Sequence, residues 1–267
     1  MLQTTNNLQL YTQNYLIDNA KGSVMITHGL GEYAARYAHV AQALNDIGLN
    51  VYTFDLRGHG HSEGERAFAK SMHEFREDAE VVFATIPQDL PVFVLGHSMG
   101  GLITLLFLMH QKRKVKGVIF SGAAFEPGDD ITSFVIFITK ILAKLFPRLQ
   151  TTKLNPKSIS RDPQTIEAYA ADPLIYHGGI KTGLGLAFLK AFDEVKPRFG
   201  EFDYPVLIMH GEADKLTNIK GSKELYAKAA SQDKTLKIWE GAYHEIFNET
   251  NRQEVIEMTA NWIKERL

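Results

Sequence analysis

The chain has 267 residues, and its 29 lysines and arginines nearly balance its 31 aspartates and glutamates, for a net charge of −2. A balanced field gives no general attraction for nucleic acid, so we expect no nucleic-acid partner. The complete absence of cysteine excludes disulfides, thiolate metal sites and cysteine nucleophiles, and fits a reducing compartment. Residues 1–15 lack the basic and apolar regions of a secretory signal, so we expect a cytoplasmic location.

The elements that follow alternate between two kinds of pattern. Residues 8–17 predict an antiparallel edge strand or hairpin. Runs of aliphatic and β-branched residues predict further strands at 24–27, 51–54, 92–95, 115–120, 206–209 and 236–239. Helical spacings lie between them, at 34–47, 72–86, 100–111, 219–230 and 253–267. Because most of the strands are apolar throughout, the alternation predicts an α/β fold with a mostly parallel, doubly wound sheet.

The alternation fails between residues 126 and 201, where helical spacings, prolines and glycines occur without a convincing strand. The break falls between two central strands, which is typical of an insertion and not of a tandem domain. We therefore interpret residues 126–201 as a helical cap, or lid, inserted into a core formed by residues 1–125 and 202–267.

Residues 96–100, Gly-His-Ser-Met-Gly, carry the strongest chemical signal. They follow the predicted strand 92–95 and precede a predicted helix, as in a G-x-S-x-G nucleophile elbow. The elbow needs small flanking residues because the serine sits on a tight, strained turn. Ser98 is therefore the candidate nucleophile.

A serine hydroxyl needs a histidine to take its proton, and the histidine needs an acid to orient it. In this type of fold both partners lie on loops after later strands, in the order serine, acid, histidine. Asp214 follows the strand 206–209 and His244 follows the strand 236–239. We predict Asp214 as the acid and His244 as the base, with Glu212 as a less favoured acid.

A tetrahedral intermediate also needs two N–H donors for its oxyanion. Met99, directly after the nucleophile, is expected to supply one of them. Leu30 is the best candidate for the other, because it lies in a glycine-containing loop after the strand 24–27. We interpret His28 and His97 as structural residues that brace these loops.

Longer motifs surround these residues: His-Gly-Leu-Gly-Glu at 28–32, Ser-Glu-Gly-Glu-Arg at 62–66, and Asp-Pro-Leu at 172–174. Together with Arg36-Tyr37 and the elbow, they resemble the monoacylglycerol lipase and lysophospholipase branch of the α/β-hydrolase superfamily over nearly the whole chain. The resemblance implies an α/β-hydrolase fold and an oxyanion hole formed by Leu30 and Met99.

The resemblance also implies that Glu32, Arg36 and Tyr169 lie near the polar end of the site, where glycerol is held. Glu32 and Arg36 are four residues apart at the start of a predicted helix, so they can pair with each other while offering hydrogen-bonding groups to a polyol. A purely structural ion pair is the alternative. The cap lacks cysteines that the mammalian lipase has near its site, which leaves chain-length preference open.

Residues 131–149 predict an unusually apolar helix, with Asp129 and Asp130 as its N-terminal cap and Pro147 as its stop. One explanation is a wide entrance for an acyl chain that contacts a membrane peripherally, with Lys140 and Lys144 toward the headgroups. The alternative is a helix buried on both sides. The longest apolar run, 134–138, is too short to span a bilayer.

Two other patterns do not predict sites. Asp55, His59 and His61 fit a loop that supports the elbow, and a serine triad needs no metal, so we expect neither metal nor cofactor. Residues 183–185, Gly-Leu-Gly, lack the preceding strand and third glycine of a dinucleotide motif.

We therefore expect a serine carboxylic-ester hydrolase that splits a monoacylglycerol, or a related long-chain lipid ester, into a fatty acid and glycerol through an acyl-enzyme. A lysophospholipase or a general carboxylesterase of the same fold is the first alternative. A noncatalytic ligand-binding protein that keeps this fold is an alternative of another class, although all three triad positions are filled.

Overall fold

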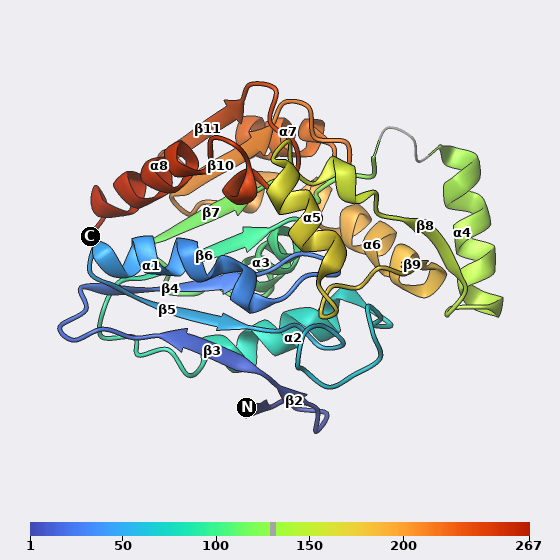
Figure 1. Ribbon diagram of the computed structural model, residues 1–267, viewed down its shortest axis with the longest axis horizontal. Coiled ribbons are helices and arrows are strands. Elements are labelled where there is room, and N and C mark those ends of the chain that lie inside the picture. The colour runs from blue at the N-terminus through green and yellow to red at the C-terminus, as the bar shows by residue number, and fades with distance from the viewer. Residues whose placement is uncertain (129–131) are drawn as a thin grey trace.

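A computed structural model describes residues 1–128 and 132–267 (Figure 1). Its centre is a seven-stranded sheet in the order β11-β10-β7-β6-β4-β5-β3, parallel except that β3 runs antiparallel to β5. The strands are β3 (Thr12–Tyr15), β4 (Gly22–Thr27), β5 (Leu49–Phe54), β6 (Val92–His97), β7 (Gly117–Ser121), β10 (Val206–Gly211) and β11 (Lys234–Trp239). The predicted mostly parallel, doubly wound α/β sheet is confirmed.

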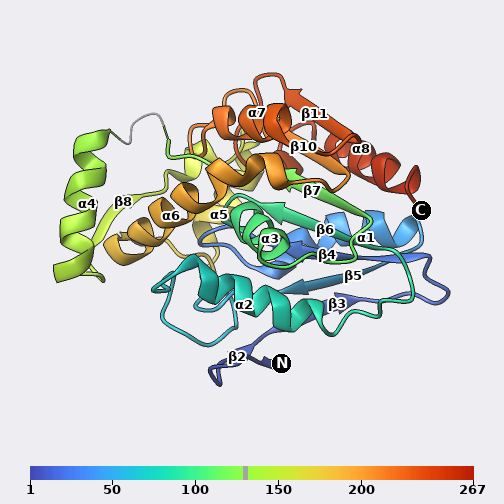
Figure 2. The same cartoon turned by 180° about the vertical axis from the view of Figure 1, so that it is seen from behind.

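Helices cover both faces of this sheet (Figures 1 and 2). On one face lie α1 (Ala38–Asp46), which follows the 3-10 turn η1 (Ala34–Tyr37), and α8 (Arg252–Lys264). On the other face lie α2 (Met72–Phe83), α3 (Met99–His110) and α7 (Ile219–Lys228). Strands β4, β6, β7 and β10 are buried at every position, because each of their faces packs against a helical layer.

The prediction of an antiparallel edge strand at residues 8–17 is right, but the strand in the sheet is shorter than predicted. Of residues 8–17, β3 joins the sheet antiparallel at its edge, as predicted. A separate two-stranded pair precedes it, formed by β1 (Leu2–Gln3) and β2 (Gln9–Leu10). The two short strands are held near the loop that follows β5, where the Ser62 hydroxyl accepts from the Tyr11 N–H at 2.8 Å.

The segment between β7 and β10 lies mainly beyond the carboxyl ends of the parallel strands (Figure 1). Its helices are α4 (Ser133–Leu145), α5 (Pro163–Ala171) and α6 (Thr182–Val195), with 3-10 turns η2 (Pro156–Ser158) and η3 (Lys196–Glu201). The expectation of no strand here is wrong, because β8 (Gln150–Lys153) pairs antiparallel with β9 (Gly179–Lys181). The β8 residues are Gln-Thr-Thr-Lys and all exposed, so they show none of the apolar alternation that marks a half-buried strand.

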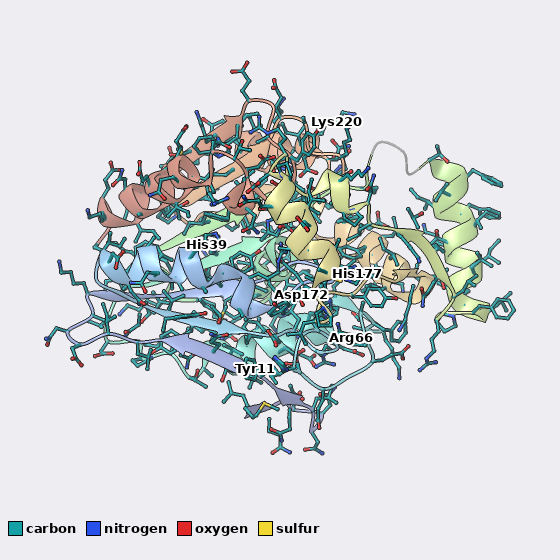
Figure 3. All side chains as sticks on the ribbon, viewed as in Figure 1. Tyr11, His39, Arg66, Asp172, His177 and Lys220 are labelled. Carbon is teal, nitrogen blue, oxygen red and sulfur yellow. The ribbon has the colours of Figure 1, made fainter. Side chains whose placement is uncertain are left out.

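Main-chain hydrogen bonds join this segment to the loops that follow β4 and β11. The Tyr176 N–H donates to the Gly31 carbonyl at 2.8 Å, and the Glu245 N–H donates to the Ile159 carbonyl at 2.7 Å. Side chains add to the docking where α5 ends, in the region of Asp172 and Arg66 (Figure 3). Arg66 donates to the Leu174 carbonyl at 2.7 Å, and the Tyr33 hydroxyl donates to Asp172 at 2.6 Å.

Helix α4 stands farthest from the sheet (Figures 1 and 2) and packs on α6. Its N-cap is Thr132, whose hydroxyl accepts from the Val135 N–H at 3.3 Å, whereas Asp129 and Asp130 lie outside the described residues. Phe134 is 70% exposed and Leu145 is 66% exposed. The alternative of a helix buried on both sides is therefore wrong.

Within the described residues, every helix is too short or too polar to cross a lipid bilayer.

Candidate active site

Ser98 lies at the turn between β6 and α3 with φ 53° and ψ −121°. This left-handed conformation is costly for a non-glycine residue, and such strain is typical of functional turns. The flanking glycines are needed because a Cβ at Gly100 would lie 2.1 Å from the Thr27 carbonyl oxygen, and one at Gly96 would lie 2.6 Å from the Gly100 oxygen. The serine side chain is left partly exposed at the start of α3.

Asp214 and His244 come together although they lie on loops after different strands, β10 and β11. The Asp214 Oδ2 atom lies 2.7 Å from His244 Nδ1, and the Asp214 side chain has 0% exposure. Its Oδ1 atom accepts from the N–H groups of Leu216 and Thr217, at 2.7 and 3.0 Å, which fixes the plane of the carboxylate. Glu212 is exposed and instead accepts from the Gly241 N–H at 3.0 Å.

The charges of this pair stabilise each other. Burial alone would raise the pKa of Asp214, but the charge of His244 and hydrogen bonds from His210 and His244 hold that pKa well below its usual range. Burial alone would lower the pKa of His244, but Asp214, Glu245 and Glu32 together raise it. An ionised Asp214 accepts from Nδ1–H, which leaves Nε2 of the neutral imidazole as the proton acceptor.

The turn after β7 lies between Ser98 and His244. The Ser98 N–H donates to the Ser121 carbonyl at 3.0 Å. The next residue, Gly122, has φ 50°, and a Cβ there would lie 3.2 Å from His244 Nδ1. The ring of His97, which precedes the serine, lies 4.7 Å from the His244 ring. Ser98 and His244 therefore flank one turn, and burial with the nearby His244 lowers the pKa of His97 to about 3, so His97 is neutral.

Sequence reasoning missed two further partners of Asp214. His210 Nε2 lies 3.2 Å from Asp214 Oδ2, and the other ring nitrogen contacts the Ser222 hydroxyl at 2.8 Å. The Thr217 hydroxyl lies 2.8 Å from the same carboxylate oxygen. His210 lies in β10, four residues before Asp214. This closeness in the sequence was the available signal.

The loop after β4 approaches Ser98 closely. A Cβ at Gly29 would lie 3.0 Å from the Ser98 Cβ, so only glycine leaves this space open. Leu30 follows in the loop and is partly exposed. Met99 is the first residue of α3, and the first N–H groups of a helix have no intrahelical acceptor. Of the two residues predicted for the oxyanion hole, Met99 directly follows Ser98 and Leu30 directly follows Gly29, which lies close to Ser98.

His28 is buried beneath this loop. Its Nδ1 atom lies 2.8 Å from the Gly29 carbonyl oxygen, and its Nε2 atom accepts from the Leu56 N–H at 2.9 Å. The imidazole therefore links the loop after β4 to the loop after β5.

The three residues predicted for the polar end also lie together. Arg36 donates to Glu32 at 2.8 Å, and its guanidinium lies 5.1 Å from the ring centre of the buried Tyr169. Arg36 has a further partner that the sequence did not reveal, because Glu245 accepts from it through both carboxylate oxygens, at 2.7 and 2.6 Å. Glu245 directly follows His244, and that adjacency was the only signal in the sequence.

The acidic and histidine side chains near the elbow have structural partners. Asp55 accepts from the N–H groups of Ala34 and His61, both at 2.8 Å. His59 Nδ1 contacts the Arg57 carbonyl at 2.9 Å. Across residues 1–128 and 132–267, no cluster of three or more His, Asp or Glu side chains could hold a metal ion.

Comparisons with known proteins identify the family of this chain. A family model described as "Serine aminopeptidase, S33" matches residues 18–251. A monoacylglycerol lipase of Mycolicibacterium smegmatis is 36% identical over 250 residues, which cover 92% of this chain and 89% of that protein. A monoglyceride lipase of Homo sapiens is also 36% identical, over 86% of this chain and 77% of that protein.

A solved structure extends the likeness to three dimensions. The crystal structure of the Paleococcus ferrophilus monoacylglycerol lipase superimposes with a TM-score of 0.88 at 30% identity, covering 97% of this chain and 100% of that one. The chain therefore belongs to the S33 serine hydrolase family, in the monoacylglycerol lipase branch of the α/β-hydrolase superfamily.

Proposed function

We propose that the protein is a monoacylglycerol lipase in which Ser98, His244 and Asp214 form the catalytic triad. The observation that carries the assignment is the 2.7 Å pair between His244 and the buried Asp214, beside a serine in a strained elbow. The family and the lipase relatives support a serine carboxylic-ester hydrolase that acts on a lipid ester.

The reaction follows from the proposed roles. His244 Nε2 takes the proton of the Ser98 hydroxyl as the oxygen attacks the ester carbonyl, and the N–H groups of Leu30 and Met99 bind the oxyanion. His244 then gives that proton to the glycerol oxygen, which leaves as the acyl-enzyme forms. A water molecule, deprotonated by the same imidazole, attacks the acyl carbonyl and releases the fatty acid and a neutral Ser98.

The proposed lid explains why the substrate would carry a long acyl chain. We propose that residues 126–201 form a lid over a core of residues 1–125 and 202–267, with the acyl chain beneath the lid. Each buried methylene contributes about 0.8 kcal/mol, so an apolar enclosure favours long chains. Glu32, Arg36 and Tyr169 lie together on the polar side and are the proposed surroundings of the glycerol.

We further propose that α4 contacts a membrane peripherally. Phe134, Phe137 and Leu145 are exposed along it, and Lys140 and Lys144 are exposed beside them. Apolar residues flanked by cations favour the boundary between acyl chains and anionic headgroups. Such a contact would bring the cap to the place where monoacylglycerols reside.

A fluorophosphonate probe and a substrate panel test the proposed function. We expect the probe to label the folded protein and the labelling to be lost in Ser98→Ala. The panel compares a long-chain 1-monoacylglycerol, a lysophospholipid, short p-nitrophenyl esters and amino-acid amides. Turnover of short esters without turnover of monoacylglycerol would refute the lipase assignment, and failure of the folded protein to react with the probe would indicate a noncatalytic binding protein.

A further inference from the structure

A buried charge network starts at the residue next to the catalytic histidine. Glu245 accepts two parallel hydrogen bonds from Arg36, and its side chain is only 6% exposed. Bidentate pairs of this kind restrict orientation as well as distance. Because Glu245 shares a peptide bond with His244, holding this carboxylate also restrains the main chain that carries the base.

The network continues from Arg36 to the loop after β4. Arg36 Nη1 donates to Glu32 Oε2 at 2.8 Å. The other oxygen of Glu32 accepts from the Gly29 N–H at 2.6 Å and from the Tyr37 hydroxyl at 2.8 Å. Gly29 immediately precedes Leu30, the proposed oxyanion donor, so hydrogen bonds lead from the base loop to the oxyanion loop.

The sheet itself does not place these two loops side by side. They follow β11 and β4, which are separated in the sheet by β10, β7 and β6. The guanidinium of Arg36 lies between carboxylates anchored to each loop and interacts with both. A buried ion network is weak evidence for stability, because desolvation of the charges offsets their attraction. The network is therefore better explained by its fixing the positions of the two loops relative to each other than by a gain in stability.

We propose that the Glu32–Arg36–Glu245 network is a positioning device that fixes the catalytic histidine relative to the oxyanion loop. Glu245 acts through the main chain of His244, and Glu32 acts through the N–H of Gly29. All four carboxylate oxygens of Glu32 and Glu245 already accept hydrogen bonds, and the donors are Arg36, Gly29, Tyr37 and Asn248. The inference rests on the proposed triad and gives Glu32 and Arg36 a role that does not require glycerol.

The test compares two esters with the same acyl chain, one of glycerol and one of p-nitrophenol, in Glu245→Gln and Glu245→Ala. Glutamine keeps the shape of the side chain but loses one charged bond to Arg36, and alanine loses both. Because small displacements of reacting groups are costly, we expect kcat to fall about 10-fold for glutamine and about 100-fold for alanine on both esters. The KM values should stay within about two-fold of wild type, since substrate binding is not removed.

A control of the same bidentate geometry, although more exposed, is the pair between Arg266 and Asp233, at 2.8 and 2.6 Å, which lies away from the described site. Asp233→Asn removes a similar charge, and its kcat should be unchanged on both esters. Thermal unfolding checks that each variant is folded; if the alanine variant is not, the glutamine variant decides.

The possible results have distinct meanings. A rise in KM on the glycerol ester alone, with normal kcat, would show that the network binds glycerol and would overturn the positioning role. Wild-type kcat on both esters for folded Glu245→Gln would overturn it as well. If the wild-type protein turns over the p-nitrophenyl ester but not monoacylglycerol, the lipase assignment is refuted. The effect of Glu245→Gln on the p-nitrophenyl ester then still decides the positioning role. Absence of Ser98 labelling would refute both.

Discussion

The imidazole of His244 is buried among several ionisable groups, and their balance decides its protonation. Asp214 contacts its Nδ1 atom, and Glu245 and Glu32 add negative charge nearby. The adjacent ring of His97 is neutral because its pKa is lowered to about 3. The net effect raises the pKa of His244 above the usual 6.5.

This shift predicts the acid limb of the pH profile. Only the neutral imidazole can accept the serine proton, so kcat/KM should rise through a midpoint above 6.5. Removing negative charge in Glu245→Gln should move this midpoint to lower pH. The measurement is kcat/KM for an uncharged ester across the pH range. A wild-type midpoint below 6.5, or a shift to higher pH in the variant, would contradict the arrangement of charges.

The sequence was informative at this scale for residues whose roles depend on chain order. The Ser98 elbow lies between a strand and a helix, and Asp214 and His244, the proposed acid and base, each follow a later strand. Glu245 and His210 could not be assigned in the same way, because their partners become neighbours only when the sheet brings several loops together. A carboxylate next to a histidine in the sequence is compatible with several roles. Only the structure shows that Glu245 pairs with Arg36.

Helix α4 exposes more large apolar side chains than any other described helix or strand. The sequence predicted its position and its excess of apolar residues, but not which face remains exposed, because that depends on where α6 packs. The pair β8 and β9 was missed for a related reason. Its residues are polar and exposed, and its pairing joins segments on either side of α5.

A double variant of α4, Phe134→Ser with Phe137→Ser, tests the proposed membrane contact. Both side chains are exposed, so the change should have little effect on folding. Burial of one phenylalanine in a lipid interface contributes about 1.5–3 kcal/mol, so loss of two should lower the affinity for vesicles by about 100-fold or more. Cosedimentation with vesicles that contain anionic lipid measures the loss.

The control for this prediction is Leu16→Ser, in the loop between β3 and β4, where the leucine is 60% exposed. It removes a comparable exposed apolar side chain outside the cap. Equal vesicle binding by the double variant and the wild type would exclude α4 as the membrane contact.

At the scale of the whole molecule, stability is unevenly distributed. Helix α3 is buried along nearly its whole length between the sheet and neighbouring helices, whereas α4 rests mainly on α6 and exposes much of its surface. Local opening requires less free energy where fewer apolar contacts are broken. Helix α4 should therefore open more readily than α3.

Native-state hydrogen exchange tests this difference. We expect amides of α4 to exchange faster than those of α3 by about 100-fold or more, as an opening free energy lower by about 3 kcal/mol requires. Mass spectrometry of peptides from the two helices measures the rates. Equal protection would mean that cap and core open as one cooperative unit.

The bonds from Tyr176 to Gly31 and from Glu245 to Ile159 join the proposed lid to the loops after β4 and β11 through main-chain atoms. Their formation does not depend on side-chain identity, so point substitutions along the lid leave them available. Grafting an entire lid from another hydrolase is different, because a change in backbone path at residues 159 or 176 removes the anchor. Engineers who seek a new substrate range by lid exchange should therefore place the graft boundaries so that both anchors are retained.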